Sequence, residues 1–207
     1  GAYEQFLEAN RLGAVIQMEL GRKPLDQMRW EEIWDAALRI RNRFLNVAIA
    51  DDLRRNLSER VMELGAHEPL AVRSSAPGED SADRSFAGLH ESYLNVVGPT
   101  AVCDAVRMVW ASLWSDAALL YRKELSLDPT KSRMAVLVQV MQNEDCSGVA
   151  FGCDPRNGDL DRAIIEAVPG VCADLVDGNT DPDRWVFARS SKQLIESRCG
   201  DTADREA

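Results

Sequence analysis

The feature that most constrains the fold is a change of hydrophobic periodicity along the chain. In the first third, apolar residues recur every three or four positions, as in the stripe from Leu53 to Leu64, which is typical of an amphipathic helix. After Met134 the apolar residues come instead in short β-rich runs separated by turns, for example 134–140 and 162–168. Helices first and consecutive strands later indicate an α+β fold, in which helices cover one face of a mainly antiparallel sheet.

The expected elements follow from these patterns. Helices are predicted over 2–12, 30–45, 53–64, 99–113 and 116–125. Strands are predicted over 70–72, 90–97, 134–140, 148–151, 162–168, 184–189 and 193–198. We expect Asp51 or Asp52 to cap one helix and Gly65 to end it. Trp30 and Trp34 follow the apolar spacing of their helix, so we expect both in the core rather than in a stacking surface.

The stretch from Leu70 to Val96 carries the most chemistry. A short buried strand is followed by Arg73 and two serines, where a cation and hydroxyl groups can meet an anion. The small-residue loop Ser85–Gly88 comes next, and backbone N–H groups in such loops can bind phosphate oxygens. Arginine after a strand and a glycine between strands are also common in simple hairpins. The residues alone leave both a phosphate site and an ordinary hairpin open.

Composition limits the classes of function. The 207 residues carry a formal net charge of −10, which argues against nucleic-acid binding because phosphate backbones attract Lys/Arg patches. An acidic protein can still bind a nucleotide when Mg²⁺ bridges carboxylates and phosphates. No apolar run approaches the ~20 residues of a membrane span, and no secretory signal is visible. Five scattered cysteines form no metal or disulfide pattern, so we expect buried free thiols and a cytoplasmic protein.

Two polar residues interrupt apolar strands. Gln139 lies within 134–140, and Glu166 lies within 162–168. A buried glutamate must be paired, protonated or metal-bound, although strand alternation can also point Glu166 to solvent or to an arginine. Acidic side chains recur in the loop 170–183, which is either a Mg²⁺-bearing nucleotide loop or a solvated acidic loop. No Walker loop, no GxGxxG after a strand and no hydrolase motif is present.

Together these motifs resemble a known family. The run VRSSAPGEDSADRSFAG followed by ESYLNV, then WASLWS, VQVM and SGVAF before Asp154-Pro155, is similar to the nucleotide-binding domain of phosphoenolpyruvate synthase and pyruvate phosphate dikinase. The resemblance implies an ATP-grasp type fold that holds Mg-ATP. It also implies phosphoryl transfer from ATP to a histidine on a separate domain, which carries the group to an acceptor.

Site residues follow from the resemblance, position by position. Arg73 matches an arginine that contacts the ATP phosphates, and Ser85, Ala87 and Gly88 match the loop over those phosphates. Gln139 matches the strand on the adenosine side, and Glu166 matches an acid near the metal. The resemblance thus implies Arg73 and Glu166 as catalytic groups, with all of these residues binding ATP. Glu166 is the implied Mg²⁺ ligand. Asp174 or Asp177 can substitute for a second acid of the family, and we expect Asp177 as the second ligand.

The chain also departs from the family pattern. A position that is usually acidic is Ala173, and a position that is usually basic is Asn179. The family's Gly-Gly-Lys start, its phosphohistidine domain and its acceptor-binding domain are not in the sequence. We therefore expect the nucleotide-binding part of a longer phosphotransferase, inactive by itself. The alternative is a diverged, non-catalytic nucleotide- or partner-binding module of the same fold.

We expect three parts in the chain. A helical segment covers 1–66, an ATP-grasp-like nucleotide-binding core covers 67–200, and a polar tail covers 201–207. The expected partners are a nucleotide and the other domains of the same protein, with neither nucleic acid nor membrane.

Overall fold

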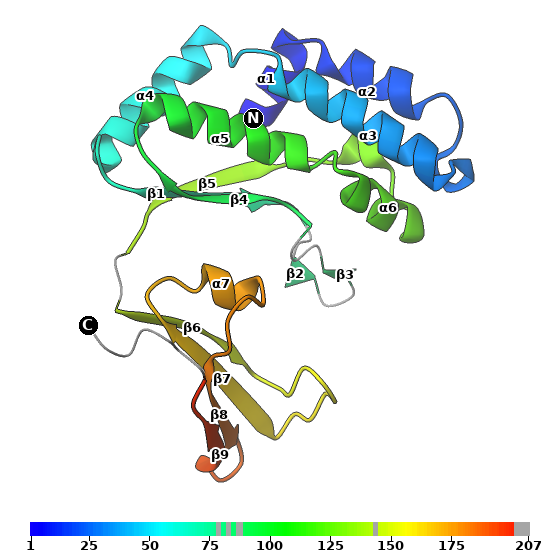
Figure 1. The fold of residues 1–207 in the computed structure, drawn as a ribbon. Helices are drawn as coiled ribbons and strands as arrows, with labels where there is room; N and C mark the ends of the chain where they lie inside the picture. Colours follow the sequence, from blue (N-terminus) through cyan, green and yellow to red (C-terminus); the bar gives the residue numbers. More distant parts are fainter. Residues whose placement is uncertain (78–79, 82–83, 86–88, 143–144, 201–207) are drawn as a thin grey trace. The chain divides into compact units, whose positions relative to one another are not determined.

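The structure is a computed structural model of the whole chain. It describes all residues except 78–79, 82–83, 86–88, 143–144 and 201–207. The described chain forms two compact units, Gly1–Met141 and Gln142–Ala207, which we call unit 1 and unit 2 and describe separately (Figure 1). Unit 1 joins the predicted helical segment to the first part of the predicted core, and the assignment of functional domains remains a proposal.

Unit 1 contains the five predicted helices and one more. The helices are α1 (Ala2–Ala9), α2 (Leu12–Leu20), α3 (Trp30–Leu45), α4 (Asp51–Leu64), α5 (Pro99–Ser112) and α6 (Asp116–Glu124), with short 3-10 turns η1 (Leu25–Gln27) and η2 (Pro129–Lys131). Helix α2 was not predicted. It follows directly on α1, its N-cap Arg11 has a left-handed φ of 54°, and no side chain caps it, so the usual start signals are missing.

The core of unit 1 lies between these helices and a three-stranded sheet. Helix α5 is central, because it packs against α3, α4 and β1 (Leu70–Ser75). An aromatic cluster fills the middle: the ring centroids of Phe6 and Trp110 lie 4.9 Å apart, and those of Phe44 and Trp114 lie 6.2 Å apart. All four side chains are buried. Burial of such large apolar surfaces is the main stabilising contribution in a domain of this kind.

The sheet of unit 1 has the strand order β4-β1-β5, with β4 at Ser92–Val96 and β5 at Ala135–Val140. Both neighbours run antiparallel to β1. In β4 a bulge places Val96 opposite Leu70 and Tyr93 opposite Val72, and Asn95 takes a left-handed φ of 57° there. This extra residue lets Tyr93 and Val96 both pack against the core. Figure 1 shows α1 to α5 on one side of this sheet.

The prediction for the two tryptophans of α3 was wrong. Ile33, Ile40 and Phe44 are buried, whereas Trp30 and Trp34 are 56% and 45% exposed. Consecutive residues of a helix point about 100° apart, so Trp34 lies beside the buried stripe rather than on it. The helix carries two apolar faces, and the sequence pattern did not distinguish them.

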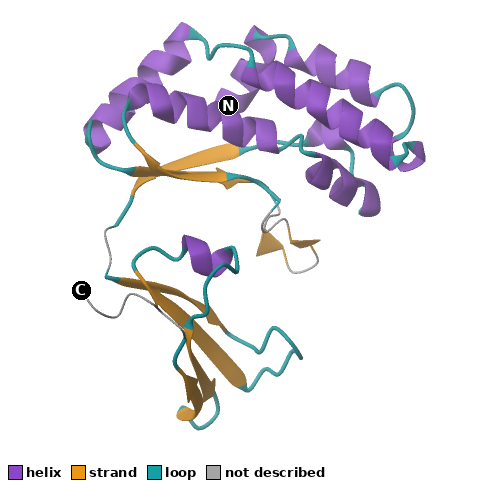
Figure 2. Ribbon diagram, in the orientation of Figure 1, coloured by secondary structure: helices purple, strands orange, loops and turns teal. Residues whose placement is uncertain are grey.

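The regular secondary structure of unit 2 is mostly strand, joined by loops, as the colours of Figure 2 show. Strands β6 (Cys146–Phe151), β7 (Arg162–Pro169), β8 (Asp183–Ala188) and β9 (Gln193–Arg198) form an antiparallel sheet in that order, with the short helix α7 (Ala173–Val176) between β7 and β8. Gly148 lies so close to β7 that a Cβ there would come within 2.2 Å of the Glu166 carbonyl oxygen. Buried Ile164, Val168 and Val186 form its small apolar core.

The α+β class and all seven predicted strands are confirmed. The expectation of one continuous sheet was wrong: the described residues form a three-stranded sheet, a four-stranded sheet and the two-stranded pair of β2 (Asp80–Ser81) with β3 (Arg84–Ser85). Ala50, not an aspartate, is the N-cap of α4, while Gly65 ends it with a φ of 121° as predicted.

Two further expectations are decided by the structure. All five cysteines are free, but only Cys103 is buried, whereas Cys146 and Cys199 are exposed. The expectation of uniformly buried thiols was therefore wrong. None of the helices in the described part of the chain combines the length and apolar character that crossing a membrane requires.

Candidate nucleotide-binding site

The open face of the β4-β1-β5 sheet brings two of the predicted site residues together. Ala71 pairs with Gln139 and Arg73 pairs with Leu137 across the β1/β5 ladder. Because residues two apart on a strand share a face, Arg73 and Gln139 lie on the same side of the sheet as diagonal neighbours. Such neighbours are within reach of one another's long side chains.

The opposite residues of the ladder explain why this face is open. Val72 and Val138 pair with each other and pack into the helix-covered core, so their neighbours must point away from the helices. Arg73 and Gln139 are accordingly exposed, and Leu137 between them is 51% exposed. Within the described chain, no hydrogen bond or ion pair engages the Arg73 side chain. An exposed cation, an amide and an apolar side chain on one face suit an anionic ligand with a flat apolar part.

The predicted phosphate loop is only partly described. The backbone of Ser85 belongs to β3 and pairs with Asp80, while Ala87 and Gly88 lie outside the described residues. Their proposed contacts with phosphate remain predictions.

A polar anchor that the sequence analysis missed follows this loop. Arg41 of α3 donates to Glu91 Oε1 at 2.9 Å, and Tyr93 Oη donates to Glu91 Oε2. The backbone N–H of Glu91 also donates to Ser112 Oγ of α5 at 3.2 Å. Burial and this carboxylate raise the pKa of Tyr93, so its phenol stays protonated and donating. Glu91 therefore connects the start of β4 to helices α3 and α5. In the sequence, the opposite charges of Arg41 and Glu91 were the one available sign of this contact, and the two residues are fifty positions apart.

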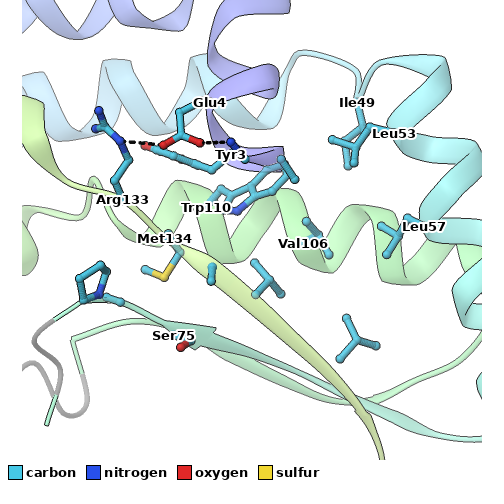
Figure 3. Close-up of a pocket in the computed structure, with 17 residues that line it drawn as sticks. Tyr3, Glu4, Ile49, Leu53, Leu57, Ser75, Val106, Trp110, Arg133 and Met134 are labelled. Atoms are coloured by element: carbon cyan, nitrogen blue, oxygen red, sulfur yellow. Dashed lines mark ion pairs between the residues drawn. The ribbon is translucent and has the colours of Figure 1, made fainter.

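A pocket lies on the helix side of the sheet (Figure 3). This pocket of about 640 Å³ lies between α1, α4, α5 and the ends of β1 and β5. Its lining is mostly apolar, with Trp110, Val106 and Met134 at its base. Glu4 at one end accepts from Arg133 at 2.9 Å. Arg73 and Gln139 are not among the lining residues, so this pocket is separate from the open face.

Glu166 lies in unit 2, on β7, opposite Arg184 of β8. The Arg184 Nε is 3.6 Å from Glu166 Oε1, and the two side chains are 21% and 26% exposed. Of the alternatives that the sequence left open, the structure shows the carboxylate paired with an arginine. Asp154 lies in the turn between β6 and β7 and is almost fully buried. It accepts two hydrogen bonds from the Arg156 side chain, which hold the pKa of its carboxyl below the usual value.

The metal prediction has limited support in the geometry. Asp177 is exposed at the C-terminal end of α7. No group of three or more His, Cys, Asp or Glu side chains in the described ranges is placed to hold a metal ion. Mg²⁺ usually takes only one or two carboxylates and fills its other positions with water and phosphate oxygens. Binding of Mg²⁺ by Glu166 and Asp177 therefore remains a prediction.

Comparison with known families decides the affiliation. Residues 1–206 match the family described as pyruvate phosphate dikinase, AMP/ATP-binding domain. The chain belongs to this family. Phosphoenolpyruvate synthase of Aeropyrum pernix is 37% identical over 202 residues, which cover 95% of this chain and 24% of that protein.

Two other relatives with this domain have names that describe different transferases. Rifampicin phosphotransferase of Streptomyces sviceus is 39% identical over 166 residues, covering 80% of this chain and 19% of that protein. A prodigiosin-synthesizing transferase of Serratia marcescens is 31% identical over 195 residues, covering 94% of this chain and 20% of that protein. The chain thus spans about a quarter or less of the length of these curated relatives.

Proposed function

We propose that the chain is the ATP-binding portion of a phosphotransferase of the phosphoenolpyruvate synthase and pyruvate phosphate dikinase type. It would hold Mg-ATP in an ATP-grasp arrangement for phosphoryl transfer to a histidine on another domain of the same protein. The observation that carries the proposal is the placement of Arg73 and Gln139 on one open sheet face. Five free thiols fit a reducing compartment, so we place the protein in the cytoplasm.

Each group has a defined task in this proposal. The Arg73 guanidinium binds phosphate oxygens and offsets the negative charge that the transferring group develops. Backbone N–H groups around Ser85, Ala87 and Gly88 orient the phosphates, and Gln139 hydrogen-bonds the adenosine part. When bound, Mg²⁺ held by Glu166 and Asp177 would neutralise phosphate charge. Phosphoryl transfer needs mostly positioning and charge stabilisation, which are the tasks that this proposal gives to these residues.

The test is calorimetry of ATP binding with and without Mg²⁺. Replacing Arg73 with alanine removes a charge-assisted hydrogen bond, which costs ~2 kcal/mol, or about 30-fold in Kd. The matched control is Arg60→Ala, because Arg60 is an exposed α4 arginine that pairs with Glu63 away from the sheet. Equal ATP affinity of the two variants would overturn the assignment of Arg73. Absence of nucleotide binding to the intact protein would overturn the proposed function.

A second candidate is a module that keeps the fold and binds a nucleotide or partner without chemistry. One support is the ion pair of Glu166 with Arg184, which partly neutralises the proposed metal ligand. The other is that the exposed residues Ala173 and Asn179 stand at positions where the family usually has a charged residue. The two candidates differ in one measurement. Incubation of the intact protein with ATP labelled with ³²P at both the β- and γ-phosphates yields an acid-labile phosphohistidine only if the catalytic function is retained.

A further inference from the structure

We propose that the exposed face of α3 around Trp30 and Trp34 is a docking site for an arginine-bearing segment of a partner protein. This surface is separate from the sheet face that carries Arg73, and the inference does not depend on nucleotide binding.

The first observation is the exposure of large apolar side chains in a row. Trp30, Trp34 and Leu38 occupy successive i, i+4 positions, so they lie on one face of the helix, and each is at least 44% exposed. Helix α3 is well supported on its other face by Ile33, Ile40 and the rest of the buried stripe. The tryptophans are therefore not needed for the core. Exposed tryptophans gathered in a row are typical of interaction surfaces.

The second observation is the chemistry of the hollow between the two indoles. A depression of about 380 Å³ is lined by Trp30, Glu31, Trp34 and Asp35. Two aromatic faces and two carboxylates line it, and none of its lining residues is a cation. Asp35 pairs with Arg39 at 3.2 Å, whereas Glu31 has no ion pair with any residue in the described ranges. The hollow thus combines ring faces with one uncompensated negative charge.

Arginine fits this combination better than other groups. A guanidinium is planar, stacks on indole faces and donates several hydrogen bonds to carboxylates, while its weak hydration lowers the cost of burial. Lysine offers a compact, strongly hydrated charge with no flat surface. A nucleotide base could stack on the rings, but its phosphates would face Glu31 and Asp35 in a chain of net charge −10. Charge complementarity therefore selects a cationic partner.

The experiment uses acetylated tetra-arginine amide as the probe, with tetra-lysine and tetra-citrulline as matched peptides, at ~0.15 M salt to screen long-range attraction. The ¹H–¹⁵N spectrum reports the indole N–H groups of the five tryptophans separately, with Trp30 and Trp34 assigned from Phe substitutions. We expect saturable shifts of these two resonances with tetra-arginine, weaker shifts with tetra-lysine and none with neutral tetra-citrulline.

Variants test the geometry. The double variant Trp30→Ala/Trp34→Ala should bind tetra-arginine about 5- to 30-fold more weakly, since two exposed cation–π contacts are lost. Glu31→Gln should weaken binding about two- to fivefold, as for an exposed ion pair. Trp185→Phe is the control, because Trp185 lies on β8 of unit 2, and it should bind like the unaltered chain. Circular dichroism checks that each variant is folded.

Three outcomes would overturn the proposal. They are equal affinity for the arginine and lysine peptides, unchanged affinity of the double variant, and shifts spread evenly over all five indoles. The proposal also fails if, in the intact protein, Trp30 and Trp34 are already protected from acrylamide quenching and do not respond to the peptide. That result would mean that another part of the same protein covers them.

Discussion

Units 1 and 2 differ in how much of their β-sheet is covered by helices. In unit 1, helices α1 to α5 cover one sheet face and enclose an aromatic core around Phe44 and Trp114. In unit 2, a larger four-stranded sheet has only the short helix α7 among its described elements, and its buried apolar residues are Ile164, Val168 and Val186. Apolar burial drives stability, and small units bury a smaller fraction of their surface. Unit 1 should therefore be the more stable of the two.

The largest expected effect is a core truncation in unit 1. Phe44→Ala removes a fully buried ring and leaves a cavity, which should lower the free energy of unfolding by ~3–5 kcal/mol. Segment-resolved hydrogen exchange measures the result, with Leu194→Ala as a control because Leu194 is 52% exposed in unit 2. If the two units are independent, the amides of β7 keep their protection. Equal loss of protection in β7 would show that both units unfold together.

An intermediate effect is expected from filling the close contact in unit 2. Gly148→Ala places a Cβ against the Glu166 carbonyl oxygen and the Ala167 backbone, and such overpacking costs ~1–3 kcal/mol. Gly152→Ala is the matched control, since a Cβ there meets nothing within 4 Å. Urea unfolding followed by the fluorescence of Trp185 reports on unit 2. Indistinguishable midpoints for the two variants would contradict the close β6–β7 packing.

The smallest effect concerns the acid sensitivity of unit 2. Hydrogen bonds from Arg156 lower the pKa of Asp154 in the folded state. The folded state thus holds its proton less tightly than the unfolded state, so this contribution to stability is present above pH ~4 and is lost as the pH falls through the folded pKa. Asp154→Asn should reduce the difference in urea midpoint between pH 7 and pH 3. A difference as large as in the unaltered chain would exclude this role.

Much of the fold could be predicted because its signals are local. The strand runs near Val138, Ile164 and Val186 are apolar, bounded by turns, and all appear in the structure. The division into separate sheets could not be predicted, since strand pairing is a long-range property that periodicity does not contain. The exposure of Trp34 was missed for a related reason: a helix with two apolar stripes does not reveal which one meets the core.

The candidate site was predicted in part. The residue type of Arg73 pointed to an anion site and the family resemblance added Gln139, but their common face depends on the register that pairs Ala71 with Gln139. The role of Glu91 was missed because its partners Arg41 and Ser112 come from distant helices. Glu166 was singled out as a buried acid in an apolar strand, yet its arginine partner is set by the pairing of β7 with β8.

The bulge at Asn95 has a consequence for how this protein can vary. It adds one residue between Tyr93 and Val96, so both side chains can reach the helices from the same strand. Removing Asn95 would abolish the bulge, because the spacing from Tyr93 to Val96 would then equal the spacing from Val72 to Leu70 on β1. Tyr93 and Val96 would then be two positions apart and would share a face in a regular strand, so the deletion would keep both side chains toward the helices and retain the hydrogen bond from Tyr93 to Glu91.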